Sequence, residues 1–368
     1  MTKWVTKKLG EILAIGNGQD YKHLHTGEVP VYGTGGVLTF VDDYLYDGET
    51  VCIGRKGTIN KPIYFEGKIW TVDTLFYTHS FVDVLPKYVY YAFCCIDWLR
   101  YNEATGVPSL SKETIYKIEI PVPDLAEQRR IAGILSSADG TIAASEALIE
   151  KYRNIKRGLL ATLLQPKEGW KKVKLGECAS LQGGFAFQSR DFSDNGIPLV
   201  RIGDITPKGL KNSNSVKLPN SFLSEYADFA LINNDTIIAM SGATVGKCTL
   251  VTEQDIPALL NQRVGRFKVK NDIDKKFLFY IVSSFQYQQK LLVDAIGGAQ
   301  PNVSPKQIES VECFIPVQKD GTPDLAEQRR IAEILSSVDA KIAAEEKVVE
   351  KYKGVKKGLM EELLKSEK

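Results

Sequence analysis

The sequence predicts an α/β fold of the α+β kind, with two globular regions separated by two long antiparallel helices in a pseudo-two-fold internal repeat. The first observation is a charged, leucine-rich segment of 41 residues that occurs at 124–164 and again at 324–364. About 26 of its 41 positions are identical, which identifies a duplication. The second observation is that a stretch of ordinary globular composition precedes each copy. The third is that both stretches contain short runs rich in Val, Ile, Tyr, Phe and Thr between Gly, Asn and Asp, which favour strands and turns.

The repeat divides the chain into four segments. They are a globular region at 1–122, a central helix at 123–165, a second globular region at 166–322 and a C-terminal helix at 323–368. At 368 residues the chain is long enough for two or three domains of ordinary size, each with its own core.

The two globular regions share landmarks in the same order. Both begin with a Trp that precedes a Leu-Gly-Glu phrase, and both contain a glycine-rich turn with a lysine. We expect an aromatic-rich helix late in each region, then a glycine loop, a Ser-x-x-x-Ile phrase and a short strand ending in Ile-Pro-Val. These landmarks are the turns 54–61 and 241–247, the helices 86–103 and 274–294, the closing phrases 105–115 and 297–308, and the strands ending at 122 and 317. The closing phrases lie 193 residues apart rather than 200, which predicts an insertion near 318–323.

The start of each long helix is predicted by its cap. Asp124 and Asp324 fit the N-cap position, and Glu127 and Glu327 follow three residues later, as in a capping box. A proline precedes each aspartate and discourages helix upstream of it.

A stripe of apolar residues along each helix predicts that the two helices pack together. The spacing alternates between three and four residues, as in a coiled coil. The stripe contains Ile131, Leu135, Ile142 and Ile149 in the first helix, and Ile331, Leu335, Ile342 and Val349 in the second. Ser145 and Glu345 interrupt it; they either fix the register or lie at a loosely packed point. About 41 residues at ~1.5 Å each make a helix of roughly 60 Å. Its stripe must be buried, and the other copy, running back antiparallel, is the expected partner.

Composition limits the classes of protein to which the chain can belong. Hydrophobic residues make up 43% and charged residues 25% of the chain, as in an average globular protein, and the net charge is only +2. A DNA-binding surface must therefore be local. The six cysteines are scattered without a CxxC pair, which indicates reduced thiols and neither disulfides nor a zinc site. We expect a cytoplasmic protein without a signal peptide or membrane span.

Two motifs look like functional sites and are set aside. The run from Ser241 to Cys248 looks like a phosphate-binding loop, but it has one residue too few between its glycines, and Cys248 stands where Ser or Thr would hold magnesium. A turn whose lysine touches a DNA phosphate is the favoured interpretation. His23 and His25 have no cysteine or carboxylate cluster beside them, so we expect an exposed loop and no metal site. We identify no catalytic residue.

The chain resembles the specificity subunit of type I restriction–modification systems over essentially its whole length. The resemblance rests on PDLAEQRRIAxIL after Ile-Pro-Val and on the glycine-loop and Ser-x-x-x-Ile closing phrase, both of which occur twice in order. It rests also on FAFQSRDFSDNGIPLVRIGDI at 185–205. In that family each globular region is a target-recognition domain that reads half of a bipartite, asymmetric site on double-stranded DNA.

The resemblance also implies partners and cofactors. In that family the helices set the gap between half-sites and dock two methyltransferase subunits, and restriction (motor) subunits complete the enzyme. The chain is then expected to be non-catalytic and to bind no cofactor itself, with S-adenosylmethionine, ATP and Mg²⁺ on the partner subunits. A rigid spacer is consistent with half-sites about one helical turn, ~34 Å, apart.

Residues able to donate hydrogen bonds to base edges or phosphates are the DNA-binding candidates. In the first globular region they are Arg55, Lys56, Asn60 and Lys61, and in the second Gln188, Ser189, Arg190, Arg201, Lys247 and Arg263. The alternative for each is a solvated surface side chain.

Two other functions are consistent with the same residues. A scaffold that holds two protein partners fits the balanced charge of the globular regions but not their landmark phrases. An enzyme that uses the Gly-Lys turn for phosphate chemistry is disfavoured by the departures of that turn from a phosphate-binding loop.

Overall fold

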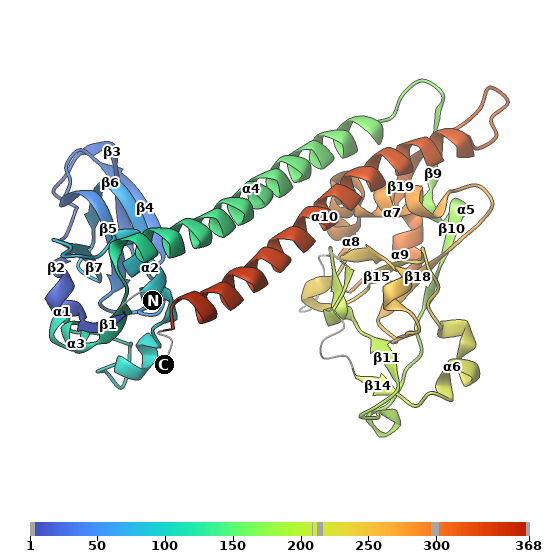
Figure 1. The fold of residues 1–368 in the computed structure, drawn as a ribbon. Coiled ribbons are helices and arrows are strands. Elements are labelled where there is room, and N and C mark those ends of the chain that lie inside the picture. The colour runs from blue at the N-terminus through green and yellow to red at the C-terminus, as the bar shows by residue number, and fades with distance from the viewer. Residues whose placement is uncertain (1–3, 208, 212–215, 296–301, 366–368) are drawn as a thin grey trace. The chain divides into compact units, whose positions relative to one another are not determined.

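The computed structural model describes residues 4–207, 209–211, 216–295 and 302–365 (Figure 1). The chain folds as two compact units: unit 1 is Met1–Leu148 with Glu345–Lys368, and unit 2 is Ile149–Ala344. Each unit contains one globular region and part of each long helix, α4 (Leu125–Leu163) and α10 (Leu325–Leu363). Within the described ranges, no helix combines the length and the apolar character needed to cross a membrane.

Unit 1 is built on a six-stranded sheet. In sheet order its strands are β2 (Ala14–Asn17), β7 (Leu75–His79), β5 (Tyr46–Gly54), β6 (Ile63–Thr71), β3 (Thr26–Gly33) and β4 (Gly36–Val41). Neighbouring strands run antiparallel, except that the end of β6 pairs with β3 in parallel. The outer elements are β1 (Val5–Lys8), α1 (Leu9–Ile12), α2 (Pro86–Cys95), η1 (Trp98–Tyr101), α3 (Lys112–Lys117) and β8 (Glu119–Val122). The Leu-Gly-Glu phrase forms α1, and Leu9 and Ile12 are completely buried in the core.

Unit 2 contains more and shorter elements. In chain order they are β9 (Trp170–Lys174), α5 (Leu175–Cys178), β10 (Ala179–Gly183), η2 (Ser189–Asp191), β11 (Ile197–Val200), η3 (Ile202–Asp204), β12 (Ile205–Thr206), β13 (Gly209–Leu210), β14 (Lys217–Leu218), α6 (Phe222–Glu225), η4 (Ala227–Phe229), β15 (Thr236–Ala239), η5 (Gly242–Thr244), β16 (Cys248–Leu250), η6 (Glu253–Asp255), β17 (Leu259–Leu260), β18 (Val264–Val269), α7 (Lys275–Ser283), α8 (Phe285–Ala295), α9 (Pro305–Ser310) and β19 (Glu312–Pro316). Two sheets form its centre, in the orders β10-β18-β15-β16 and β14-β11-β17. The fold is thus a mixture of helices and strands in both units, as the sequence predicts.

The same strand frame underlies both units. The antiparallel order β2-β7-β5-β6 in unit 1 recurs as β10-β18-β15-β16 in unit 2, and the order β4-β3-β6 recurs as β14-β11-β17, with the same parallel pair. A short pair, β1 with β8 or β9 with β19, closes each frame. In unit 1 the long strand β6 takes part in both sets of pairs. In unit 2 it is replaced by β16 and β17, which residues 251–258 separate, so one sheet becomes two.

Glycine is required at one point of this frame in each unit. Gly18 donates its N–H to Leu75 O, and Gly184 donates its N–H to Val264 O. A Cβ atom on Gly18 would lie 1.9 Å from the backbone oxygen of Val72, and one on Gly184 would lie 2.3 Å from a backbone oxygen of the matching turn. At both positions the backbone passes too close to a neighbouring backbone segment for any larger residue.

The predicted aromatic helices are shorter than expected. In place of one helix at 86–103, α2 ends at Cys95, Ile96 is extended, and a separate 3₁₀ turn follows. In place of one helix at 274–294, Ser284 is extended and separates α7 from α8. The hydroxyl of Ser284 donates to Ile281 O, and the indole of Trp98 donates to Phe93 O. These side chains satisfy carbonyls that a helix end leaves without partners, so each break is stabilised locally.

The caps of the long helices are partly as predicted. Asp124 accepts hydrogen bonds from the N–H groups of Ala126 and Glu127, and Asp324 accepts one from Glu327. The prediction of a complete capping box is wrong. The carboxylate of Glu127 accepts two hydrogen bonds from Arg130 instead of one from the N–H of Asp124. The insertion predicted near 318–323 is a tight turn that the bridge between Val317 and Pro323 closes.

Candidate nucleic-acid interface and helix attachments

Loops from four parts of the chain meet in unit 1. The backbone N–H groups of Arg55 and Lys56 donate to Thr74 O, and Leu110 donates to Arg55 O. An added Cβ on Gly57 would meet the hydroxyl of Thr34 at 3.6 Å. We call residues 33–36, 54–61, 72–74 and 104–111 the unit 1 loop cluster. Arg55, Lys56, Asn60 and Lys61, the sequence candidates in this region, all belong to it and are exposed.

The matching loops meet in unit 2. Met240 donates its N–H to Arg263 O, Val303 donates to Met240 O, and an added Cβ on Gly242 would meet Ile202 at 3.5 Å. We call residues 201–204, 240–247, 261–263 and 302–304 the unit 2 loop cluster. Part of the predicted closing phrase, 297–301, lies outside the described residues.

Three of the six candidates in unit 2 belong to its loop cluster. They are Arg201, Lys247 and Arg263. The guanidinium of Arg201 lies 3.7 Å from the carboxylate of Asp204, and its side chain is 40% exposed, so it is anchored but still accessible. The other three, Gln188, Ser189 and Arg190, are exposed at η2 on the connection between β10 and β11, which is not one of the segments of the cluster.

Two cationic residues that sequence reasoning did not select have defined positions. Lys112, at the start of α3, donates from Nζ to Ile15 O at 2.6 Å, beside Arg55 of the loop cluster. Arg266 is buried in β18 and donates to Asp228 O, Ala230 O and the side chain of Gln182, so it fastens the 219–235 insertion to the sheet. Arg266 is therefore structural, whereas Lys112 is a candidate for contact with an anion.

The Gly-Lys turn of unit 2 does not form a phosphate-binding loop. Val245 donates its N–H to Gly242 O, Gly246 to Ala239 O and Lys247 to Thr244 O. A phosphate-binding loop needs backbone N–H groups that point at the phosphate, and these are already used. Within the described ranges, no group of three His, Cys, Asp or Glu residues is placed to hold a metal ion.

A buried glutamine attaches each long helix to its globular region. Gln128 of α4 accepts a hydrogen bond from the N–H of Leu85 at 2.8 Å and donates to Asp83 O and Pro123 O. Gln328 of α10, which is 200 residues later, accepts from the N–H of Asp274 at 2.8 Å and donates to Asp272 O. Both side chains are completely buried, so their amide groups need these hydrogen bonds in place of those with water.

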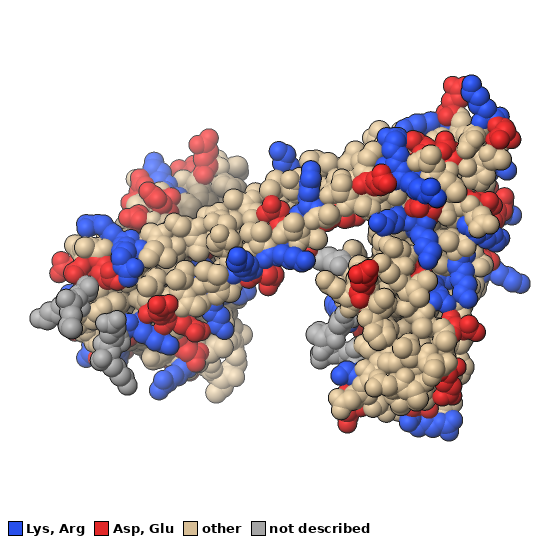
Figure 2. All heavy atoms as spheres, turned by 45° about the vertical axis from the view of Figure 1, so that its right-hand side comes forward, with Lys and Arg blue, Asp and Glu red and all other residues tan. Residues whose placement is uncertain are grey.

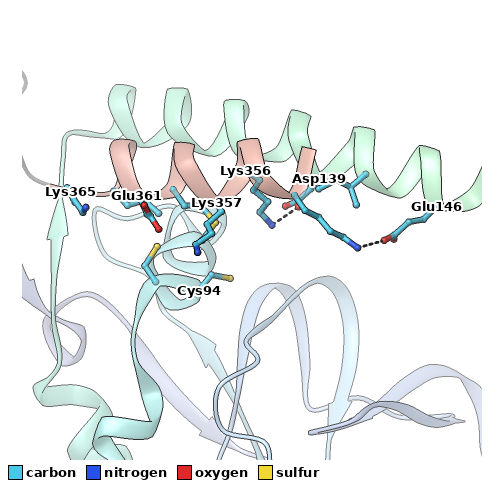
Figure 3. Close-up of a pocket in the computed structure, with 12 residues that line it drawn as sticks. Cys94, Asp139, Glu146, Lys356, Lys357, Glu361 and Lys365 are labelled. Atoms are coloured by element: carbon cyan, nitrogen blue, oxygen red, sulfur yellow. Dashed lines mark hydrogen bonds and ion pairs between the residues drawn. The ribbon is translucent and has the colours of Figure 1, made fainter. Parts of the chain in front are cut away.

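A second attachment joins the globular region of unit 1 to both helices. The hydroxyl of Tyr91 donates to Asp139 at 2.8 Å and lies 3.1 Å from the hydroxyl of Ser136. Lys356 of α10 donates to the same aspartate at 2.5 Å (Figure 3). Its ammonium group lies 5.4 Å from the centre of the Tyr91 ring. Burial, more than any other cause, raises the pKa of Tyr91 above its usual value, so its hydroxyl stays protonated and remains a donor.

The same cluster occurs in unit 2. The hydroxyl of Tyr280 donates to Asp339 at 2.8 Å and lies 3.2 Å from the hydroxyl of Ser336, and Lys156 of α4 lies 2.6 Å from Asp339. The lysine is again close to the tyrosine ring, at 5.7 Å. The helix that supplies the aspartate in one unit supplies the lysine in the other. We call these two groups the attachment clusters.

In each unit the two helices run antiparallel. In unit 1, Lys356 pairs with Asp139 while Lys353 pairs with Glu146, so the residue numbers rise on one helix as they fall on the other. In unit 2, Lys156 reaches Asp339 while Lys341 lies over the ring of Tyr152.

The predicted stripe residues lie on the inner side of the helices. Ile131 and Leu135 pack with Tyr88, Tyr91 and Leu364 in unit 1. Ile331 and Leu335 pack against the core of unit 2 and against Leu159 and Leu163. The remaining stripe residues Ile142, Ile149 and Val349 are buried, and Ile342 is half-buried.

A cavity of about 800 Å³ in unit 1 lies between α2 and the two helices (Figure 3). Ile142, Met360 and Leu364 line it together with Cys94, Cys95 and several charged residues. Burial raises the pKa of Cys94 to about 11, so this thiol is protonated near neutral pH and is a poor nucleophile.

The surface has mixed charge. On the face shown in Figure 2, acidic and basic side chains are interspersed on both units, and the lower part of unit 2 shows mainly uncharged side chains. On this face a nucleic acid would therefore meet local groups of cations rather than a continuous basic surface.

Comparison with known proteins gives one consistent result. The family model described as type I restriction modification DNA specificity domain matches residues 1–152 and 167–351. The MjaVIII specificity subunit of a type I restriction enzyme from Methanocaldococcus jannaschii is 29% identical over 346 residues, which are 87% of this chain and 77% of that protein. The EcoBI specificity subunit from Escherichia coli is 28% identical over 206 residues, 54% of this chain and 37% of that protein. The S subunit of a type I restriction–modification system from M. genitalium has a similar fold, with a TM-score of 0.73 at 15% identity, covering 100% of this chain and 97% of that one.

Proposed function

Because the chain belongs to the type I restriction–modification DNA specificity family and is a specificity subunit of such a system, we propose that its two loop clusters read two different DNA half-sites. Each half-site belongs to one bipartite, asymmetric site on double-stranded DNA. The observation that carries the proposal is that the two units share their strand frame and their helix attachments but differ in the loops that meet beside the frame. Base readout depends on such side chains, whereas the frame only positions them.

The long helices supply the distance between the half-sites in this proposal. They are the most similar part of the repeat, and each unit holds both of them through an attachment cluster. The same helices dock two methyltransferase subunits, and restriction subunits join the assembly. S-adenosylmethionine, ATP and Mg²⁺ are bound by those partners, and this chain binds none of them.

Mapping of methylated sites tests the half-sites. The chain is co-expressed with an adenine-methyltransferase subunit of a type I system, and methylated positions are read by sequencing. A gapped, asymmetric motif is expected. A stable complex that neither methylates nor binds DNA contradicts the proposal and favours a protein scaffold, and ATP turnover by the isolated chain would favour an enzyme.

Deletion of one heptad from each helix tests the spacer. Residues 142–148 and 342–348 lie between the two attachment clusters on both helices, so removing them leaves Asp139, Lys156, Asp339 and Lys356 in place. Seven residues at ~1.5 Å each shorten a helix by roughly 10 Å, or about 3 base pairs of DNA. The methylated motif should keep both half-sites and lose about 3 base pairs from its gap.

The matched variant repeats 142–148 and 342–348 and should lengthen the gap by a similar amount. Melting curves of both variants establish that they fold. A folded variant with altered half-sites, or with an unchanged gap, contradicts the spacer role.

A further inference from the structure

Two cations lie beside one aromatic ring in unit 1. The guanidinium carbon of Arg55 is 6.0 Å from the centre of the Phe76 ring, and the ammonium nitrogen of Lys112 is 5.9 Å from it. With Asn17, Leu110 and Ser111 they line a hollow of about 320 Å³. A second hollow, lined by Arg55 and Lys56 among others, adjoins it at the loop cluster.

Backbone carbonyls hold both cations without neutralising them. Arg55 donates from Nη1 to Asp73 O at 3.3 Å, and Lys112 donates from Nζ to Ile15 O at 2.6 Å. Within the part of the chain that the structure describes, no ion pair joins either cation to a carboxylate, and the exposed Asp73 contributes its backbone oxygen. Burial lowers the pKa of Lys112, and the positive charge of Arg55 lowers it further. Two like charges therefore repel each other at fixed positions, and a bound anion would relieve that repulsion.

The arrangement is peculiar to unit 1. In unit 2 Met240 occupies the position equivalent to Arg55. Val303 donates its N–H to Met240 O, just as Leu110 donates its N–H to Arg55 O in unit 1. The residue after the cap serine of the following short helix is Lys112 in unit 1 and Pro305 in unit 2. The shared frame requires neither cation, so their presence together calls for a separate explanation.

We propose that this hollow binds a phosphate group of the DNA backbone beside the half-site read by unit 1, held by Arg55 and Lys112. The proposal rests on the function proposed above and adds an anchor that unit 2 lacks at the matching positions. A backbone phosphate is favoured over a free one because the adjoining hollow, which shares Arg55, is lined by the exposed Lys56 of the loop cluster, and a duplex that contacts the loops would pass there. A phosphate contact fixes the position of a duplex and carries no sequence information.

The salt dependence of DNA binding tests the proposal. The chain in complex with its methyltransferase subunit is titrated with a duplex containing the mapped site and with a scrambled duplex, over a series of KCl concentrations. Each phosphate contact contributes roughly 0.9 to the slope of log binding constant against log salt. Because the two cations share one phosphate, the double variant of Arg55→Gln and Lys112→Gln should lose roughly 0.9 of the slope on both duplexes. Each single variant should lose part of it, with the methylated motif unchanged.

Two matched variants control the experiment. Lys117→Gln removes an exposed lysine from the other end of α3 and should leave the slope unchanged, and Lys112→Arg keeps the charge and should retain the wild-type slope. Equal slopes for Lys112→Gln and Lys117→Gln overturn the proposal. Failure of the proposed function looks different, because the wild-type complex would then show no preference for the mapped duplex.

A second measurement distinguishes the source of the phosphate. The chain alone is melted in inorganic phosphate and in chloride at equal ionic strength. If phosphate stabilises the wild type but not Lys112→Gln, while the two have equal DNA slopes, the hollow binds a free phosphate and its assignment to DNA is wrong.

Discussion

Unit 1 and unit 2 have the same strand frame but use it differently. Unit 1 joins its strands into one six-stranded sheet through the unbroken β6, and its β3–β4 connection is the short turn 33–36. In unit 2 the equivalent of β6 is broken, and the equivalent turn is the segment 201–216, which contains η3, β12 and β13. Unit 2 carries a further insertion at 219–235, which the buried Arg266 ties to the sheet. Loops tolerate such changes because most of their backbone is at the surface, where water satisfies its polar groups.

The parts that do not differ are those that contact the long helices. Gln128 and Gln328 make equivalent hydrogen bonds, and the attachment clusters repeat the same Tyr, Ser, Asp and Lys with similar distances. The duplication therefore preserved the join between globular region and helix while the loops changed. If the join is the shared element, equivalent substitutions in the two units must have equivalent effects.

Replacing the buried glutamines should have the largest effect. Gln128→Leu keeps the volume but leaves the N–H of Leu85 and two carbonyl oxygens without partners in a buried place. Gln328→Leu likewise leaves the N–H of Asp274 and the carbonyl oxygen of Asp272 without partners in unit 2. Each should destabilise its unit by about 3 kcal/mol. Hydrogen exchange of α2 in the first variant and of α7 in the second, with Gln289→Leu on the exposed face of α8 as control, measures this. An effect confined to one unit would contradict the equivalence.

The sequence predicts the repeated elements well because their signals are local. The long helices begin and end within about one residue of the repeated segments, since the cap aspartates and the alternating apolar spacing lie within the helices themselves. The Gly-Lys turn meets the closing phrase in each unit, through the bridges Lys56–Ser109 and Ser241–Asn302, and the order of the shared landmarks does not reveal this pairing.

Sheet order and side-chain partners could not be predicted because they depend on residues far apart in the chain. Arg55 and Lys112 become neighbours only because β5 and α3 both lie next to Phe76, and no local pattern distinguishes Lys112 from the exposed Lys117. The breaks after Cys95 and at Ser284 depend on hydrogen bonds that stabilise an ended helix, which helical periodicity does not reveal. The boundaries of the units pass through both helices, whereas a reading along the chain divides it into consecutive segments.

Removing the lysine of an attachment cluster should have a smaller effect. Lys356→Met removes the hydrogen bond to Asp139 while the methionine still covers Tyr91, and Lys156→Met is the matched change at Asp339. Because these lysine side chains are only 18% and 25% exposed, each loss should cost about 1 kcal/mol, more than an exposed ion pair contributes. Lys353→Met is the control, because its pair with Glu146 is about half exposed. Chemical denaturation of the three variants ranks them, and a control loss as large as the others would contradict the distinction.

The ion pairs in the first turn of each long helix should show the smallest effect, and they test the equivalence through pH. Hydrogen bonds from Arg130 lower the pKa of Glu127 below its usual 4.5, and those from Arg330 do the same for Glu327. A carboxyl group whose pKa is lower in the folded state stabilises the fold above pH 4.5 and loses that contribution as the pH falls through the folded pKa. The melting temperatures of Glu127→Gln and Glu327→Gln should therefore lie slightly below that of the wild type at pH 7 and approach it as the pH is lowered below 4.5. The two variants should behave alike, since a hydrogen bond from an arginine is the main cause of the lowered glutamate pKa in both units. The arginine side chains are about half exposed, which keeps the difference small. A difference that widens as the pH falls would mean that these carboxylates are not stabilised by their arginines.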